Sequence, residues 1–180
     1  MSEPSLITIE RKTKETEIVV SLPENPEATP DLSIDSPVPF FNHMLEAMLF
    51  HGGFGAMIRA TGDVEVDPHH LVEDVGLVLG DALLELQERR KSVLRFGHAV
   101  VPMDDALAEV TVDACKRPYL VYHASFPQAY AGSFDLSLAP ARVDAGVVRR
   151  GHAIARRIAE RAALEGLVCV EMFVLRSGEV

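Results

Sequence analysis

The sequence predicts a mixed α+β fold, and three patterned stretches indicate it. Residues 5–21 alternate between apolar and polar side chains, which is typical of one or two strands with a polar face. An apolar stripe at helical spacing follows from Phe40, and a longer one runs from Pro68 to about residue 87. Between the two helices, residues 56–66 have the composition of a strand or of a hairpin. The first half of the chain therefore has the predicted order strands, helix, strands, helix.

Length and composition exclude several classes of protein. The chain has 180 residues, 48% of them hydrophobic, which suits one folded domain or two small packed halves. A formal net charge of −10 argues against general nucleic-acid binding. Neither a signal pattern nor an apolar run of roughly 20 residues is present, so we expect a cytoplasmic protein that binds no membrane. Cys115 and Cys169 are expected to be buried thiols.

The remaining elements follow from their local residues. Five prolines between residues 22 and 39 predict a loop, with a short strand around Leu32 and Ile34. The helix from Phe40 is expected to stop at Gly52-Gly53. In the second half, residues 110–114 and 118–122 are expected to form strands.

The sequence Asp67-Pro68-His69-His70-Leu71-Val72-Glu73-Asp74 predicts a metal-binding helix start. Asp67 suits the N-cap and Pro68 the first helical position. His69 and Glu73 are then i,i+4 neighbours on one face, able to hold one ion. His70 lies about 100° further round the helix and faces a second ion or a supporting side chain. Imidazole with carboxylate suits a divalent transition metal of the Mn, Fe, Co or Zn kind.

Four other polar residues have both an ordinary and a functional interpretation. His43 lies off the apolar stripe of the first helix, and a lone helical histidine is usually a surface residue or one whose hydrogen bonds are satisfied. His51 ends that helix, a position that favours a cation. Arg95 and Arg117 are either surface charges or clamps for an anionic group such as phosphate.

A series of short motifs narrows these alternatives. In chain order they are Thr13-Lys14-Glu15-Thr16, Pro39-Phe40-Phe41-Asn42-His43-Met44-Leu45, His51-Gly52-Gly53, Gly62-Asp63, His69-His70-Leu71-Val72-Glu73-Asp74-Val75-Gly76, Arg95-Phe96-Gly97, Pro102-Met103-Asp104 and Arg117-Pro118-Tyr119-Leu120. Over roughly residues 5–138 the chain closely resembles the imidazoleglycerol-phosphate dehydratases, the manganese enzymes of histidine biosynthesis.

The resemblance implies a fold, an assembly and a reaction. The fold is an internally duplicated α+β structure, similar to domain 2 of ribosomal protein S5, with halves at residues 1–90 and 91–180. Subunits of the family form a large symmetric homo-oligomer with active sites at subunit interfaces. The reaction is dehydration of imidazole glycerol phosphate to imidazole acetol phosphate, by a lyase whose metal binds the substrate ring as imidazolate.

The resemblance also implies roles for matched residues. Two Mn²⁺ ions per subunit are expected, with first-half ligands His43, His69, His70 and Glu73. The residues expected to line the substrate site are Glu15, His51, Arg95 and Arg117. Among them, the arginines lie near the phosphate, and Glu15 is the candidate for moving protons.

Two departures from the family pattern bear on activity. Asn42 stands where the family usually has aspartate, which weakens any carboxylate support of the neighbouring imidazole. From about Ala139 the second His-His-x-x-Glu motif of the family is missing, and His152 is the only imidazole there. A frame change in the gene or true divergence explains this composition equally well. The tail is still compatible with a helix over residues 142–165 and a strand at 167–175.

Two alternatives to an active dehydratase remain. One is a non-catalytic or impaired relative with an incomplete metal centre, acting as an assembly subunit; the missing second motif favours it. The other is a mononuclear metal hydrolase using His69, His70 and Glu73. The lack of a nucleophile and of a third convincing histidine argues against the hydrolase.

Overall fold

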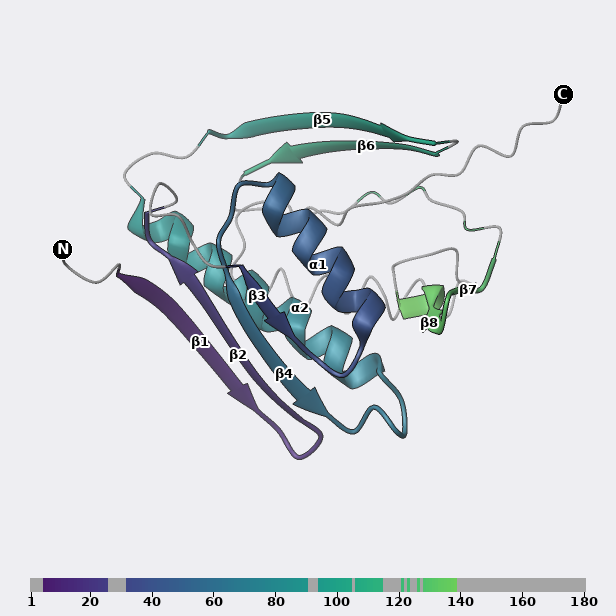
Figure 1. The fold of residues 1–180 in the computed structure, drawn as a ribbon. Coiled ribbons are helices and arrows are strands. Elements are labelled where there is room, and N and C mark those ends of the chain that lie inside the picture. The colour runs from purple at the N-terminus through teal and green to yellow at the C-terminus, as the bar shows by residue number, and fades with distance from the viewer. Residues whose placement is uncertain are drawn as a thin grey trace, which may run out of the picture. The chain divides into compact units, whose positions relative to one another are not determined.

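The computed structural model describes residues 5–25, 32–90, 94–104, 106–114 and 128–138, together with Val121, His123 and Phe126. The chain divides into two compact units, Met1–Val93 and Leu94–Val180. The mixed α+β class is confirmed, because the first unit combines a four-stranded sheet with two helices (Figure 1). The internal duplication and the division at residue 90 stay predictions.

The sheet of the first unit has the strand order β1-β2-β4-β3. Its strands are β1 (Leu6–Lys12), β2 (Thr16–Pro23), β3 (Ser33–Asp35) and β4 (Met57–Gly62). β2 is antiparallel to both β1 and β4, whereas β3 is parallel to β4. Of the one or two strands expected within residues 5–21, two form, and the short strand expected within the proline-rich segment is confirmed as β3.

The hairpin alternative for residues 56–66 is wrong. β4 ends at Gly62, and the carbonyl of Asp63 then accepts a hydrogen bond of 2.8 Å from the Val66 N–H. This bond closes a tight turn that leads into the next helix, so no second strand returns along β4.

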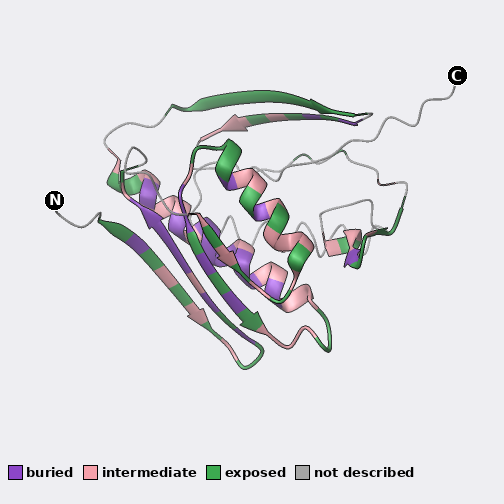
Figure 2. Cartoon of the chain, viewed as in Figure 1, coloured by how far each residue is buried: buried purple, intermediate pink, exposed green. Residues whose placement is uncertain are grey.

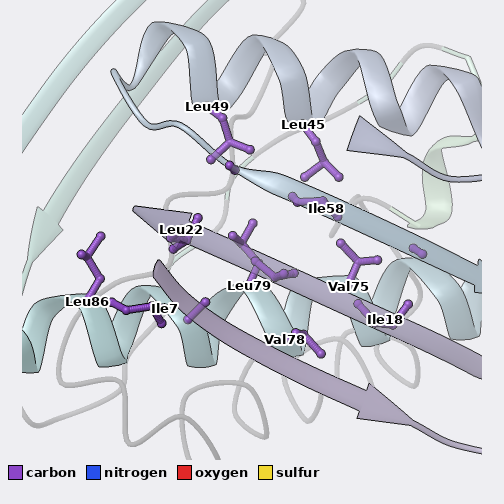
Figure 3. Packing of buried hydrophobic residues seen from close by; sticks show 14 of the residues in the cluster. Ile7, Ile18, Leu22, Leu45, Leu49, Ile58, Val75, Val78, Leu79 and Leu86 are labelled. Carbon is purple, nitrogen blue, oxygen red and sulfur yellow. The ribbon is translucent and has the colours of Figure 1, made fainter. Parts of the chain in front are cut away.

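Two helices, α1 (Pro39–His51) and α2 (His69–Arg89), complete the hydrophobic core. Strand alternation places apolar side chains of β1, β2 and β4 on one face of the sheet, where both helices contribute to the same buried cluster (Figure 3). The fully buried large side chains are Ile7, Ile18, Val20, Leu22, Leu49, Ile58, Leu71, Val75 and Val78. Burying each stabilises the fold by roughly 1.5–3 kcal/mol. None of the helices in the described residues is long and apolar enough to cross a membrane.

The predicted stripe of α1 is only partly buried. Leu45 and Leu49 lie in the core, Phe41 and Met48 pack against it, and the helix ends at Gly52 as expected. Phe50, which does not belong to this stripe, is 70% exposed.

The described part of the second unit contains a long hairpin. β5 (Phe96–Met103) pairs in antiparallel register with β6 (Ala106–Asp113), which confirms a strand over most of residues 110–114. β5 is exposed along its whole length (Figure 2). β7 (Tyr130–Ala131) and β8 (Phe134–Asp135) form a short pair followed by a 3₁₀ turn at Leu136–Leu138.

Several sequence predictions lie outside the described residues. They concern the strand at residues 118–122, the helix at 142–165, the strand at 167–175, and the burial of Cys115 and Cys169.

Candidate metal centre

The start of α2 is shaped by the residues just before it. The helix begins at His69, one residue later than predicted, with Pro68 in helical conformation before it. The Asp67 carboxylate accepts a hydrogen bond of 2.8 Å from the His69 N–H, and the Pro68 carbonyl accepts one of 3.0 Å from the Val72 N–H. Asp67 thus satisfies a backbone donor that would otherwise be free at the helix N-terminus, as an N-cap does.

His69 and Glu73 lie together on one face of α2, as the helical spacing predicts. His69 Nε2 is 3.4 Å from Glu73 Oε2, and the side chains are 43% and 23% exposed. Both groups therefore remain accessible while they lie close enough to bind one ion together.

His70 faces a different carboxylate. Its Nδ1 lies 3.6 Å from Asp63 Oδ1, in the turn after β4. The rings of His69 and His70 are nearly perpendicular, at 77°, with centroids 6.1 Å apart. The prediction that the two adjacent histidines diverge is confirmed.

Asp63 is the residue near this site whose role sequence reasoning missed. Its Oδ1 and His70 Nδ1 are both buried, and neither has a hydrogen-bond partner among the described residues. Buried polar atoms without partners are rare, so an orphaned pair that faces each other calls for a function. A proton on Nδ1 directed at Asp63 leaves Nε2 of His70 free to bind a metal. The Gly62-Asp63 motif was the available signal, but sequence alone does not show that it faces His70.

Glu15 occupies the turn between β1 and β2, with an exposed side chain. Its carbonyl oxygen accepts a hydrogen bond of 3.1 Å from the Asp63 N–H. The structure therefore joins the turn that carries Glu15 to the turn that carries the partner of His70.

His43 and His51 both lie on α1. His43 is exposed in the first half of the helix, and His51 is its exposed last residue, where a cation is favoured. The His51 ring lies edge-on to Phe50, with centroids 5.3 Å apart.

The donor set of α2 fits a manganese-class ion in its chemistry, because it combines imidazole with carboxylate. Within the described residues, however, no three His, Cys, Asp or Glu side chains gather closely enough to hold an ion. The described part of one chain therefore offers partial sites, such as the pair of His69 and Glu73.

Asn42 has a structural role that the sequence did not predict. Its side-chain amide donates a hydrogen bond of 2.9 Å to the Ser36 carbonyl and accepts one from the Ser36 hydroxyl. These two hydrogen bonds connect the loop before α1 to the first turn of the helix. The Asn42 amide is thus engaged with Ser36.

In the second unit, Arg95 is paired with Asp113. Arg95 Nε donates to Asp113 Oδ1 at 2.8 Å, and a terminal nitrogen lies 3.4 Å from Oδ2. The guanidinium also lies 5.0 Å from the centre of the Phe96 ring. Asp113 thus orients this candidate phosphate clamp. Arg117 and His152 lie outside the described residues.

Comparison with known proteins identifies the family. Residues 36–160 match the family model for imidazoleglycerol-phosphate dehydratase. The chain belongs to the imidazoleglycerol-phosphate dehydratase family. The family match begins later and extends farther than residues 5–138, the stretch over which the motifs were recognised. It includes the candidate residues from His43 to Arg117, and His152, whereas Glu15 precedes it.

Individual dehydratases agree with this assignment. The enzyme of Geobacter sulfurreducens is 50% identical over 131 residues, which cover 73% of this chain and 66% of that protein. The dehydratase of Limosilactobacillus fermentum is 48% identical over 128 residues, covering 71% and 65%. The matched part of the chain thus spans slightly less than two thirds of these relatives.

Solved dehydratase structures share the fold. The crystal structure of the Staphylococcus aureus enzyme aligns with a TM-score of 0.70 at 30% identity, covering 97% of this chain and 86% of that one. The Pyrococcus furiosus enzyme aligns with a TM-score of 0.60, also at 30% identity, covering 95% and 81%.

Proposed function

We propose that this family member dehydrates imidazole glycerol phosphate to imidazole acetol phosphate in histidine biosynthesis. The observation that carries the proposal is the divergence of His69 and His70, each facing its own carboxylate at the start of α2. In a chain of this family, such an arrangement suits two separate Mn²⁺ ions.

Some residues of this chain are assigned to metal binding and others to the substrate. His69 with Glu73, and His70 supported by Asp63, would hold Mn²⁺ together with His43. A bound Mn²⁺ ion supplies Lewis-acid polarisation of the substrate's imidazole ring. Glu15 transfers protons, and its exposed place in the β1–β2 turn leaves its carboxylate free to reach a substrate.

The phosphate group is assigned to the arginines, with His51 lining the site. Arg95 is already oriented by Asp113, so little side-chain freedom is lost when it binds an anion. Arg117 is proposed as the second phosphate ligand from its motif alone.

The proposed site is completed by another copy of the chain in a large homo-oligomer. The pair of His69 and Glu73 supports this proposal, because it is a partial ligand set within the part of the chain that the structure describes. Exposed apolar side chains on β5, among them Phe96 at 69% and Met103 at 53%, also favour association. Sedimentation of the purified protein tests it, and a monomer at micromolar concentration would contradict it.

Metal content and turnover test the function together. After incubation with manganese, elemental analysis should give two ions per subunit, and the protein should release imidazole acetol phosphate from substrate. Glu15→Gln should abolish turnover and leave the metal content unchanged, because Glu15 is assigned to proton transfer. Unchanged turnover in this variant would remove Glu15 from that role.

The second candidate is a non-catalytic relative that serves as an assembly subunit. The absence of a second His-His-x-x-Glu motif from the sequence favours it. One ion or none per subunit, with an intact oligomer and no turnover, would establish this alternative. The hydrolase alternative is not proposed, since His69 and His70 face different carboxylates and would not share one ion.

A further inference from the structure

Asp74 is a buried carboxylate on α2 that none of the assigned roles uses. It is 8% exposed and follows Glu73 directly. Its Oδ1 accepts a hydrogen bond of 2.7 Å from Arg11 Nε on β1, and its Oδ2 accepts one from the Thr16 hydroxyl on β2. A buried carboxylate is costly unless it is paired and hydrogen-bonded, and these two partners satisfy both conditions.

The Thr16 hydroxyl connects Asp74 to the turn between β1 and β2. Because Thr16 donates its proton to Asp74, it accepts from the Thr13 hydroxyl, 3.0 Å away. Thr13 Oγ1 in turn accepts the N–H groups of Glu15 and Thr16 at 3.1 and 2.9 Å. One chain of hydrogen bonds therefore runs from α2 to the backbone of Glu15.

A second attachment holds the other side of Glu15. Its carbonyl accepts the Asp63 N–H, and Gly62 lies so close that a Cβ there would stand 3.1 Å from the Glu15 oxygen. The backbone of Glu15 is thus held from two directions. One runs through Thr16 and Asp74 to the helix of His69 and Glu73, and the other is the N–H of Asp63, whose side chain faces His70.

We propose that Asp74 is a positioning residue, which holds the β1–β2 turn against α2 so that the Glu15 carboxylate keeps a fixed place relative to the metal ligands. The inference rests on the proposed function, in which Glu15 transfers protons during the reaction. Asp74 touches neither substrate nor metal in this role and acts through Thr16 and Thr13.

Thr16→Val tests the link with little change of shape, because it removes the hydroxyl and keeps the branched side chain. A misplaced proton-transfer group lowers the rate of the chemical step, so kcat should fall roughly 10- to 100-fold. KM and the manganese content should stay within about twofold, since the assigned phosphate and metal ligands are untouched. Thr16→Ser retains the hydroxyl and should restore most of kcat. Asp74→Asn provides a second variant with the same expected pattern.

Thr8→Val is the matched control. Thr8 also lies in the sheet and shares a side-chain hydrogen bond of 2.9 Å with Ser21, but it has no bond to the Glu15 turn. Its kcat should equal that of the unmodified protein. An equal loss of kcat in Thr16→Val and Thr8→Val would overturn the positioning role. A loss of kcat in Thr16→Val that is accompanied by a matching loss of bound manganese would also overturn it. An unchanged kcat in folded Thr16→Val would overturn it as well.

Hydrogen–deuterium exchange separates this inference from the proposed function. Amide exchange in residues 13–17 of the metal-loaded protein should be at least about tenfold faster in Thr16→Val and unchanged in Thr8→Val. If the unmodified protein has no dehydratase activity, the proposed function fails, while faster exchange still supports the link from Asp74 to the Glu15 turn. Unchanged exchange in Thr16→Val overturns the link, whatever the activity.

Discussion

His70 Nδ1 and Asp63 Oδ1 lie 3.6 Å apart, and both atoms are buried without a hydrogen-bond partner in the described residues. A small approach of the two side chains would form a hydrogen bond, which would fix the imidazole tautomer with Nε2 free. Carboxylate support of this kind orients a metal-binding histidine and raises its basicity. The pair joins the turn after β4 to the first turn of α2.

Asp63→Ala should therefore weaken manganese binding by roughly 10- to 100-fold, the usual effect of removing such support. Calorimetric titration of the metal-free protein with MnCl₂ measures this directly. Asp35→Asn, at the exposed end of β3, is a charge-matched control that should leave the affinity unchanged. Equal affinities for the Asp63 variant and the unmodified protein would show that His70 binds metal unaided, or not at all.

Gly62→Ala should destabilise the fold and disturb the Glu15 turn. An added Cβ would lie 3.1 Å from the Glu15 carbonyl oxygen and 3.2 Å from Thr16 Cγ2, both tighter than ordinary contacts. Overpacking of this kind costs about 1–3 kcal/mol. Urea denaturation should show the loss of stability, with kcat falling more than KM rises.

Gly97→Ala is the control for this change. The nearest atom to a Cβ there is Val112 Cβ at 3.8 Å, which is an ordinary contact. Its denaturation midpoint should match that of the unmodified protein. A midpoint for Gly62→Ala equal to that of this control would mean that Glu15 and Thr16 move away from Gly62 at little cost.

Arg95→Gln should raise KM by roughly ten- to hundredfold, because a charge-assisted hydrogen bond to a phosphate contributes about 1.5–3 kcal/mol. Steady-state kinetics on the manganese-loaded protein measures the change. Arg59→Gln removes an exposed charge from β4 and should leave KM as it is. A KM unaffected by the loss of Arg95 would assign that residue to its structural pair with Asp113 alone.

The ion pair between Arg89 and Glu24 should make the stability of the fold depend on pH in the acid range. Hydrogen bonds from Arg89 and Ser5 hold the pKa of Glu24 below its ordinary value of 4.5. A lowered pKa in the folded state means that the stabilisation is present above pH 4.5 and is lost as the pH falls through the folded pKa. The effect is small because the pair lies at the surface.

Melting temperatures between pH 7 and pH 3 test this expectation. Arg89→Gln should lower the melting temperature slightly at pH 7, and the difference from the unmodified protein should shrink as Glu24 becomes protonated. Arg90→Gln serves as the charge-matched control next to it. A difference that is constant across this pH range would show that the contribution of Arg89 does not depend on the charge of Glu24.

The sequence by itself determined the elements of the first unit and the shared face of His69 and Glu73. Alternation produced β1 and β2, helical spacing produced α1 and α2, and Gly52 ended α1. These outcomes depend on residues a few positions apart, whose relative directions are fixed by backbone geometry alone. Even so, the sequence did not reveal that β5 is an exposed strand or that residues 64–66 form a turn.

Only the tertiary structure decided which carboxylates support the site. Asp74 accepts a hydrogen bond from Arg11, which lies 63 positions away in the sequence. The contact between Asp63 and His70 depends on how the turn after β4 packs on α2. Likewise, Asp113 reaches Arg95 only because β5 and β6 pair in one particular register. Such contacts are set by the packing of distant segments, which local periodicity does not encode.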